Sequence, residues 1–150
     1  MMKFLLTSIL VLVLLVNVGC TDANLVKLSQ ALSDTATAMG TLQTTVIAAN
    51  KQGLVSDANT ETILRLCFKI NAGGQEASKV ARALTKLTAP SSSSILAILT
   101  PVIAAVNDAV TTGVLGITDA NTKNTIYTTL VAIQTALNTA QAILAATGGQ

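Results

Sequence analysis

The sequence predicts an all-α protein whose main part is an antiparallel four-helix bundle. Apolar residues recur at steps of three and four over four separate stretches, which is typical of helices that pack along one stripe. Short gaps separate these stretches, so consecutive helices are expected to run antiparallel. We see no stretch with the strict alternation of a half-buried strand.

The first two predicted helices carry long apolar stripes. The first stripe consists of Leu25, Leu28, Leu32, Thr35, Met39, Leu42, Val46 and Ala49, and Lys51-Gln52-Gly53 closes this helix. The second stripe consists of Ile63, Leu66, Ile70, Gly73, Ala77, Val80, Leu84 and Leu87. Glycine costs about 1 kcal/mol relative to alanine inside a helix, so we expect a kink or a close helix approach at Gly73-Gly74.

The third and fourth helices are predicted after a serine-rich segment, Thr88-Ala89-Pro90-Ser91-Ser92-Ser93-Ser94. Pro101 falls inside the third stripe, and Thr100 can cap a helix that has Pro101 at its first position. The third helix is therefore expected to be kinked or split near Pro101. Its stripe consists of Ile95, Leu99, Val102, Val106, Ala109 and Gly113. After Gly113-Val114-Leu115-Gly116, the fourth stripe consists of Ile126, Leu130, Ile133, Leu137, Ala140 and Leu144.

One tetrapeptide occurs three times, as TDAN at 21–24, SDAN at 56–59 and TDAN at 118–121. Each copy stands just before an apolar stripe, where a Ser or Thr hydroxyl can accept hydrogen bonds from the first turn and Asp complements the helix dipole. A calcium loop starting at Asp57 is excluded, because Thr62 and Phe68 stand where glycine and glutamate are needed. The copies are therefore predicted to be helix starts.

Two longer matches indicate a duplicated helical hairpin. Residues 53–60 resemble residues 115–122, and VIAA occurs at both 46–49 and 102–105. Two copies are too few for a solenoid. The expected architecture is a bundle of two related hairpins.

The N-terminus has the build of a secretory signal. Lys3 precedes an apolar run of about fifteen residues, shorter than the roughly 20 residues of a membrane span. The run ends in Asn17-Val18-Gly19-Cys20, which resembles the lipobox of bacterial lipoprotein precursors. Val18, Gly19 and Cys20 fit that pattern, and Asn17 departs from its usual leucine.

This resemblance implies a lipoprotein-type signal peptide over residues 1–19 and a diacylated Cys20 as the new N-terminus. Residues 20–24 would hold the acylated cysteine and a tether, and residues 25–147 the bundle domain. Thr21 in place of Asp implies, in a Gram-negative cell, the periplasmic side of the outer membrane. Two alternatives stay open: cleavage after Ala23 would release a soluble protein, and an uncleaved signal would itself be a membrane anchor.

The composition argues against most catalytic chemistry. There is no histidine, and with Cys20 acylated Cys67 is the only other thiol, which excludes zinc sites and histidine-based triads. Cys67 lies among apolar residues and is predicted to be buried core filler. The acidic candidates for a carboxylate pair lie in different stretches: Asp34, Glu61, Glu76 and Asp108. We therefore predict no enzyme, no metal site and no cofactor.

Charge is sparse and unevenly distributed. Charged residues make up 11% of the chain, and the net charge of +2 includes Lys3, so the mature chain gives no reason to bind nucleic acid. By their spacing, Lys79, Arg82 and Lys86 are expected on one helix face, as a contact for anionic lipid or polysaccharide or as a solvated stripe.

The third predicted helix is apolar on more than one side, because Leu96, Ile98, Ile103 and Val110 lie off its stripe. This surplus indicates a central helix, an oligomer contact, or a groove for a lipid or a partner helix. Asn107 and Asp108 argue against a membrane span.

These observations predict a membrane-anchored envelope lipoprotein with a non-enzymatic structural or protein-interaction role. Its expected partners are the membrane, through the N-terminal lipid, and a second copy or another envelope protein. The alternative is an exported carrier of hydrophobic ligands between the third and fourth helices, or a membrane-active helical module. A phage-encoded envelope lipoprotein is compatible with either function.

Overall fold

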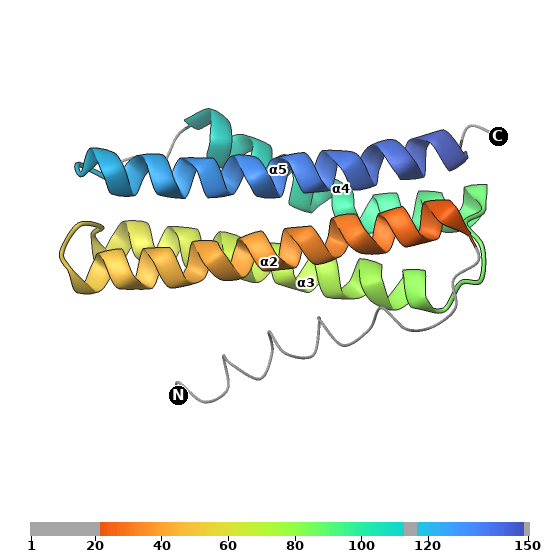
Figure 1. Cartoon of the computed structure of the whole chain (residues 1–150), viewed down its shortest axis with the longest axis horizontal. Coiled ribbons are helices and arrows are strands. Elements are labelled where there is room, and N and C mark those ends of the chain that lie inside the picture. The colour runs from red at the N-terminus through yellow and green to blue at the C-terminus, as the bar shows by residue number, and fades with distance from the viewer. Residues whose placement is uncertain (1–21, 113–116, 149–150) are drawn as a thin grey trace.

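The protein is an antiparallel four-helix bundle. The computed structural model describes residues 22–112 and 117–148, in which the helices are α2 (Ala23–Lys51), α3 (Asp57–Arg82), α4 (Ala89–Thr112) and α5 (Ala120–Gly148). Helices α2 and α4 each pack against both α3 and α5, so the four helices form a ring around one core. Consecutive helices run in opposite directions (Figure 1). The predicted fold class is confirmed, whereas the signal peptide and Cys20 lie outside the described residues.

The stripes of α2 and α5 form two sides of the core as predicted. Every residue of both stripes is buried, including Thr35, whose side-chain hydroxyl donates to the carbonyl of Ala31 at 2.9 Å. That bond satisfies the one polar group in the α2 stripe, so the hydroxyl does not carry the cost of an unpaired buried donor.

Helix α3 buries smaller side chains than its predicted stripe. Cys67 and Ala81 are buried, whereas the neighbouring Leu66 and Val80 are only half-buried. The helix also ends at Arg82, so the last two predicted stripe positions, Leu84 and Leu87, lie beyond it. Small residues facing inward allow α3 to lie close to its neighbours, while the larger side chains flank the contact.

The two central glycines of α3 differ in their surroundings. Helix α3 is continuous through both residues. A Cβ atom added at Gly73 would collide with Cγ2 of Val102 on α4, whereas one added at Gly74 would meet nothing within 4 Å. Of the two predicted outcomes at this point, the close helix approach is therefore the one observed, and Gly73 is its contact residue.

Helix α4 begins earlier than predicted. The serine-rich segment was expected to be a linker, but α4 starts at Ala89 and includes all four serines. Its start is fixed by a reciprocal cap, in which Ser91 Oγ accepts from the Thr88 amide at 2.9 Å and Thr88 Oγ1 accepts from the Ser91 amide at 3.4 Å. Pro90 lies in the first turn, where no helical N–H bond is needed.

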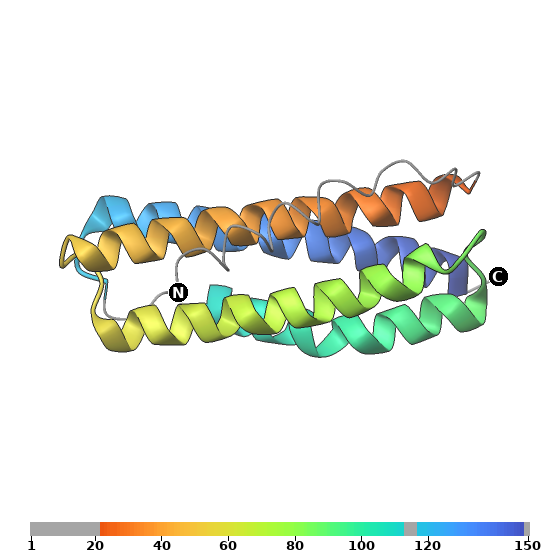
Figure 2. The same cartoon turned by 90° about the horizontal axis from the view of Figure 1, so that it is seen from below.

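Pro101 interrupts the hydrogen bonding of α4 without splitting the helix. Helix α4 is continuous from Ala89 to Thr112, and Thr100 does not cap a new helix, because its hydroxyl donates to the carbonyl of Leu96 at 2.8 Å. Pro101 has no N–H to donate and lies on the exposed side. The ribbon of α4 changes direction near its middle (Figure 2), and α4 crosses α5 so that its last turns emerge on the other side of α5 (Figure 1).

The three tetrapeptides are helix starts, as predicted, but the capping atom differs among them. Ser56 caps through its hydroxyl, whereas the carboxylates of Asp22 and Asp119 cap the helices of the first and third copies. A carboxylate accepts a stronger hydrogen bond than a hydroxyl does from the free backbone amides of the first helical turn. This explains why Asp serves as the cap in these two copies. In the second copy, Asp57 instead accepts from the side-chain amide of Asn50 at 2.8 Å.

Candidate functional site

A shallow hollow lies on the outer side of α3. Its described lining residues all belong to the first half of this helix, and the hollow is open to solvent. They are Asp57, Thr60, Glu61, Leu64, Arg65 and Phe68. We call this surface the α3 hollow.

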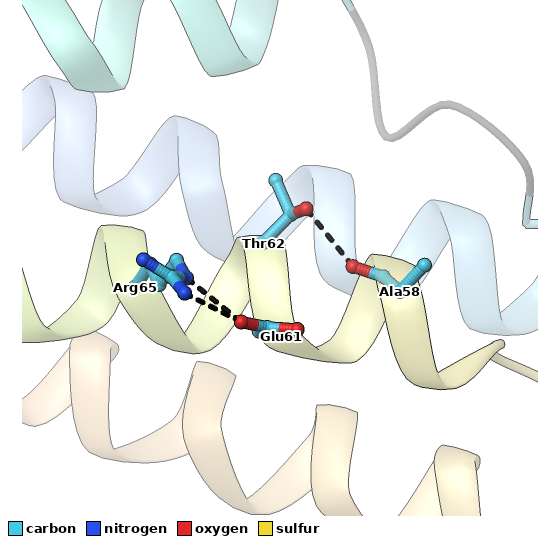
Figure 3. A network of polar contacts seen from close by, with 4 residues as sticks. All are labelled: Ala58, Glu61, Thr62 and Arg65. Carbon is cyan, nitrogen blue, oxygen red and sulfur yellow. Dashed lines mark hydrogen bonds and ion pairs between the residues drawn. The ribbon is translucent and has the colours of Figure 1, made fainter.

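The α3 hollow combines an ion pair with an exposed aromatic side chain. Arg65 donates to Glu61 Oε1 from Nε at 3.0 Å and from Nη2 at 2.6 Å, one turn apart on the helix (Figure 3). Both side chains are largely exposed, so this ion pair contributes at most about 1 kcal/mol. Beside it, Phe68 is 73% exposed, which is unusual for a large aromatic side chain. The α3 hollow offers an aromatic ring and an ion pair.

No metal centre is formed by the described parts of the chain. Within residues 22–112 and 117–148, no group of three His, Cys, Asp or Glu side chains is placed to hold a metal ion. The four acidic residues considered from the sequence lie on different helices or different turns, at Asp34, Glu61, Glu76 and Asp108.

The three basic residues predicted on one helix face do not share a helix. Lys79 and Arg82 lie in the last turn of α3, but Lys86 lies beyond its end, in the connection to α4. The prediction was wrong because α3 ends at Arg82. Directly after it, the Ala83 amide donates to the carbonyl of Val80 at 3.1 Å, which closes the last turn. All three side chains are exposed nonetheless.

Asp22 joins the start of α2 to this connection. Its Oδ1 accepts from the amides of Asn24 and Leu25 at 2.8 and 3.1 Å, and its Oδ2 accepts from the Leu87 amide at 3.3 Å. These bonds, foremost that from the Leu25 amide, hold the pKa of Asp22 below its ordinary value, with a smaller contribution from Lys86. No local sequence pattern links Asp22 to Lys86, because they lie 64 positions apart in the chain.

The predicted apolar face of α4 is largely used in packing. Ile103 is buried in the core, and the other three residues are half-buried and pack against it: Leu96, Ile98 and Val110. None of them lines the α3 hollow. A ligand between α4 and α5 would have to displace side chains that already contact the core.

Helices α4 and α5 are long and apolar enough to cross a membrane, judged by length and composition alone. In the bundle their stripes contribute to the core, and core helices can satisfy the same criterion of length and composition as membrane spans. They are also joined by a partly buried hydrogen bond, in which Gln134 Nε2 donates to Asn107 Oδ1 at 2.9 Å. Because this bond satisfies the side-chain oxygen of Asn107, the residue can pack against α5 without leaving that oxygen unpaired.

Cys67 is a core residue, as predicted. Its side chain has no exposed surface, and burial raises the pKa of the thiol to about 12.

We expect the Cys67 thiol of the folded protein to resist a water-soluble disulfide reagent at pH 8, because the reactive thiolate is suppressed and the sulfur is covered. Modification should require unfolding, so its rate should match the unfolding rate measured by circular dichroism. The Cys20→Ser variant isolates this thiol, because it leaves Cys67 as the only cysteine. Rapid modification of the folded variant would contradict the buried placement.

Comparison with protein-family models, with curated proteins and with solved structures finds no match for this chain. The fold defines the protein as an all-α bundle. Because such bundles host many unrelated functions, the surface features carry the functional information.

Proposed function

We propose that this protein is a lipid-anchored envelope protein with a non-enzymatic, protein-interaction role. The observation that carries the proposal is the start of α2. Asp22 is the N-cap of that helix and stands only two residues after Cys20. Two residues span at most about 7 Å, so an acylated Cys20 would hold this end of the bundle at the membrane.

The tether between Cys20 and the bundle is shorter than the sequence predicted. Residues 20–24 were predicted to contain it, but Ala23 and Asn24 are already helical. A bundle that starts this close to its anchor has its position and orientation restricted by the membrane. This arrangement suits a protein that presents a surface at a fixed height.

The α3 hollow supports an interaction role. It combines the exposed ring of Phe68 with the Arg65–Glu61 pair, and aromatic and arginine side chains are the residue types that contribute most at protein interfaces.

Cys20→Ser tests the anchor. In membranes, the unaltered protein is expected to have a mass corresponding to an acylated N-terminal Cys20, whereas the variant should carry no lipid and should be lost from that fraction in its mature form. After complete denaturation with reductant, the mature protein should show one reactive thiol, that of Cys67, because a thioether blocks the other. Two thiols would indicate that Cys20 is unmodified.

The control for this experiment is Cys67→Ala, which removes the other cysteine. It should keep the acylated mass and the membrane location while showing no reactive thiol after denaturation. An unmodified start at Asn24 in the soluble fraction would contradict the anchor and would favour a secreted protein.

The second candidate is a carrier of hydrophobic ligands or a membrane-active module, favoured by the apolar character of α4 and α5. A carrier should bind a fluorescent fatty acid as a monomer. That binding should be lost in Val110→Asn or Leu96→Asn, which alter half-buried positions, whereas a change at Ile103 would also disturb the core. The proposed envelope protein should not bind the fatty acid.

A further inference from the structure

Three segments of the chain meet at the end of the bundle where α2 begins. They are the first turns of α2, the last turn of α3 and the connection between α3 and α4 (Figures 1 and 2). The hydrogen bond from the Leu87 amide to Asp22 Oδ2 fixes the connection against the start of α2. The last turns of α5 also lie at this end (Figure 1).

The exposed charges at this end are mainly positive, and Glu76 is an exposed carboxylate one turn before Lys79. We call Lys27, Lys79, Arg82 and Lys86 the basic end of the bundle; all four side chains are exposed. Over residues 22–33, 77–94 and 136–148, the only acidic residue is Asp22. The carboxylate of Asp22 accepts from three backbone amides and also interacts with Lys86, so it offsets only part of the charge of the four exposed cations.

The opposite end has a different balance of charge. The residues around the α2–α3 turn and the start of α5 include three basic and four acidic side chains. They are Lys51, Arg65, Lys123, Asp57, Glu61, Asp108 and Asp119. The described residues thus carry their surplus of positive charge at one end of the long axis, and that end is the one where α2 begins.

We infer that the basic end binds the anionic phospholipid headgroups of the membrane that holds the acyl chains of Cys20. The inference rests on the proposed anchor, which would bring Asp22 within about 7 Å of the lipidated residue. Electrostatic attraction is effective over about 8 Å at physiological salt, so the four cations reach the headgroups. The bundle then stands with its long axis away from the membrane, and the α3 hollow lies in its outer half.

The test uses the mature protein reconstituted into vesicles of phosphatidylcholine alone or of phosphatidylcholine with phosphatidylglycerol. Hydrogen exchange is measured for peptides that cover residues 83–88 and the first turns of α2. We expect exchange at these sites to be at least about fivefold slower on the anionic vesicles, with the difference lost in high salt. Equal exchange on both kinds of vesicle would overturn the inference.

Matched charge variants identify the responsible residues. The triple variant Lys79→Gln, Arg82→Gln, Lys86→Gln should lose the difference between the two kinds of vesicle. The control Lys51→Gln, Lys69→Gln, Lys123→Gln removes the same charge outside the basic end and should keep the difference between the two kinds of vesicle. The inference is wrong if the two variants behave alike, or if an anionic polysaccharide protects these sites while anionic vesicles do not.

Flotation separates this inference from the anchor itself. An acylated protein floats with neutral vesicles whatever its charges, so failure to float with them would refute the anchor. In that case, flotation with anionic vesicles that is lost only in the Lys79, Arg82 and Lys86 variant still supports the basic end. Failure to float with either kind of vesicle overturns both proposals.

Discussion

Replacing Ile70 with alanine is expected to lower the free energy of unfolding by about 2 to 5 kcal/mol, the usual cost of removing a large aliphatic side chain from a packed core. Ile70 is 1% exposed and belongs to the buried stripe of α3. Denaturant unfolding followed by circular dichroism measures the loss.

The control for Ile70→Ala is Phe68→Ala, two residues earlier on the same helix. Phe68 is the larger side chain but is 73% exposed, so its removal should change the free energy of unfolding by no more than about 0.5 kcal/mol. A larger loss from Phe68→Ala than from Ile70→Ala would mean that α3 faces the core with the other side.

Gly73→Ala and Gly74→Ala are expected to shift stability in opposite directions. Alanine at Gly74 meets no neighbour and should stabilise the helix by up to about 1 kcal/mol. Alanine at Gly73 collides with Val102, and overpacking of this kind typically costs about 1 to 3 kcal/mol. The same denaturant measurement resolves the difference in sign.

A compensating change tests the cause of the Gly73→Ala loss. In a Val102→Ala background the collision is removed, so Gly73→Ala should then be much less harmful, with a favourable coupling between the two substitutions. If Gly73→Ala and Gly74→Ala stabilise the protein equally, α3 and α4 do not approach each other at this residue.

The sequence was most informative for α2 and α5, because most of the large aliphatic side chains of each helix fall on a single stripe. In α3, Leu66 and Cys67 are both apolar, as are Val80 and Ala81, so hydrophobicity alone could not assign the buried member of each pair. Packing against close neighbours selects the smaller one, and that constraint becomes visible only when the partner helix is placed.

The start of α4 was misjudged for a local reason. Four consecutive serines resemble a linker by composition, yet the paired bonds between Thr88 and Ser91 make the same residues a helix start. The basic end was only partly predicted. Lys27 belongs to α2 and reaches the other three cations only through helix packing, and Lys86 lies in the connection after α3. The α3 hollow was not anticipated, since a single exposed Phe68 on a helix has no sequence signal distinct from a core residue.

The packing of α2 against α5 has a consequence for the order of folding. These are the first and last helices of the bundle, and each covers part of the other's stripe. A growing chain that still lacks α5 leaves the stripe of α2 partly uncovered, and burial of that stripe supplies much of the driving force for folding. The bundle can therefore close only when nearly all of α5 has been synthesised, so a partly made chain stays unfolded, as the proposed export would require.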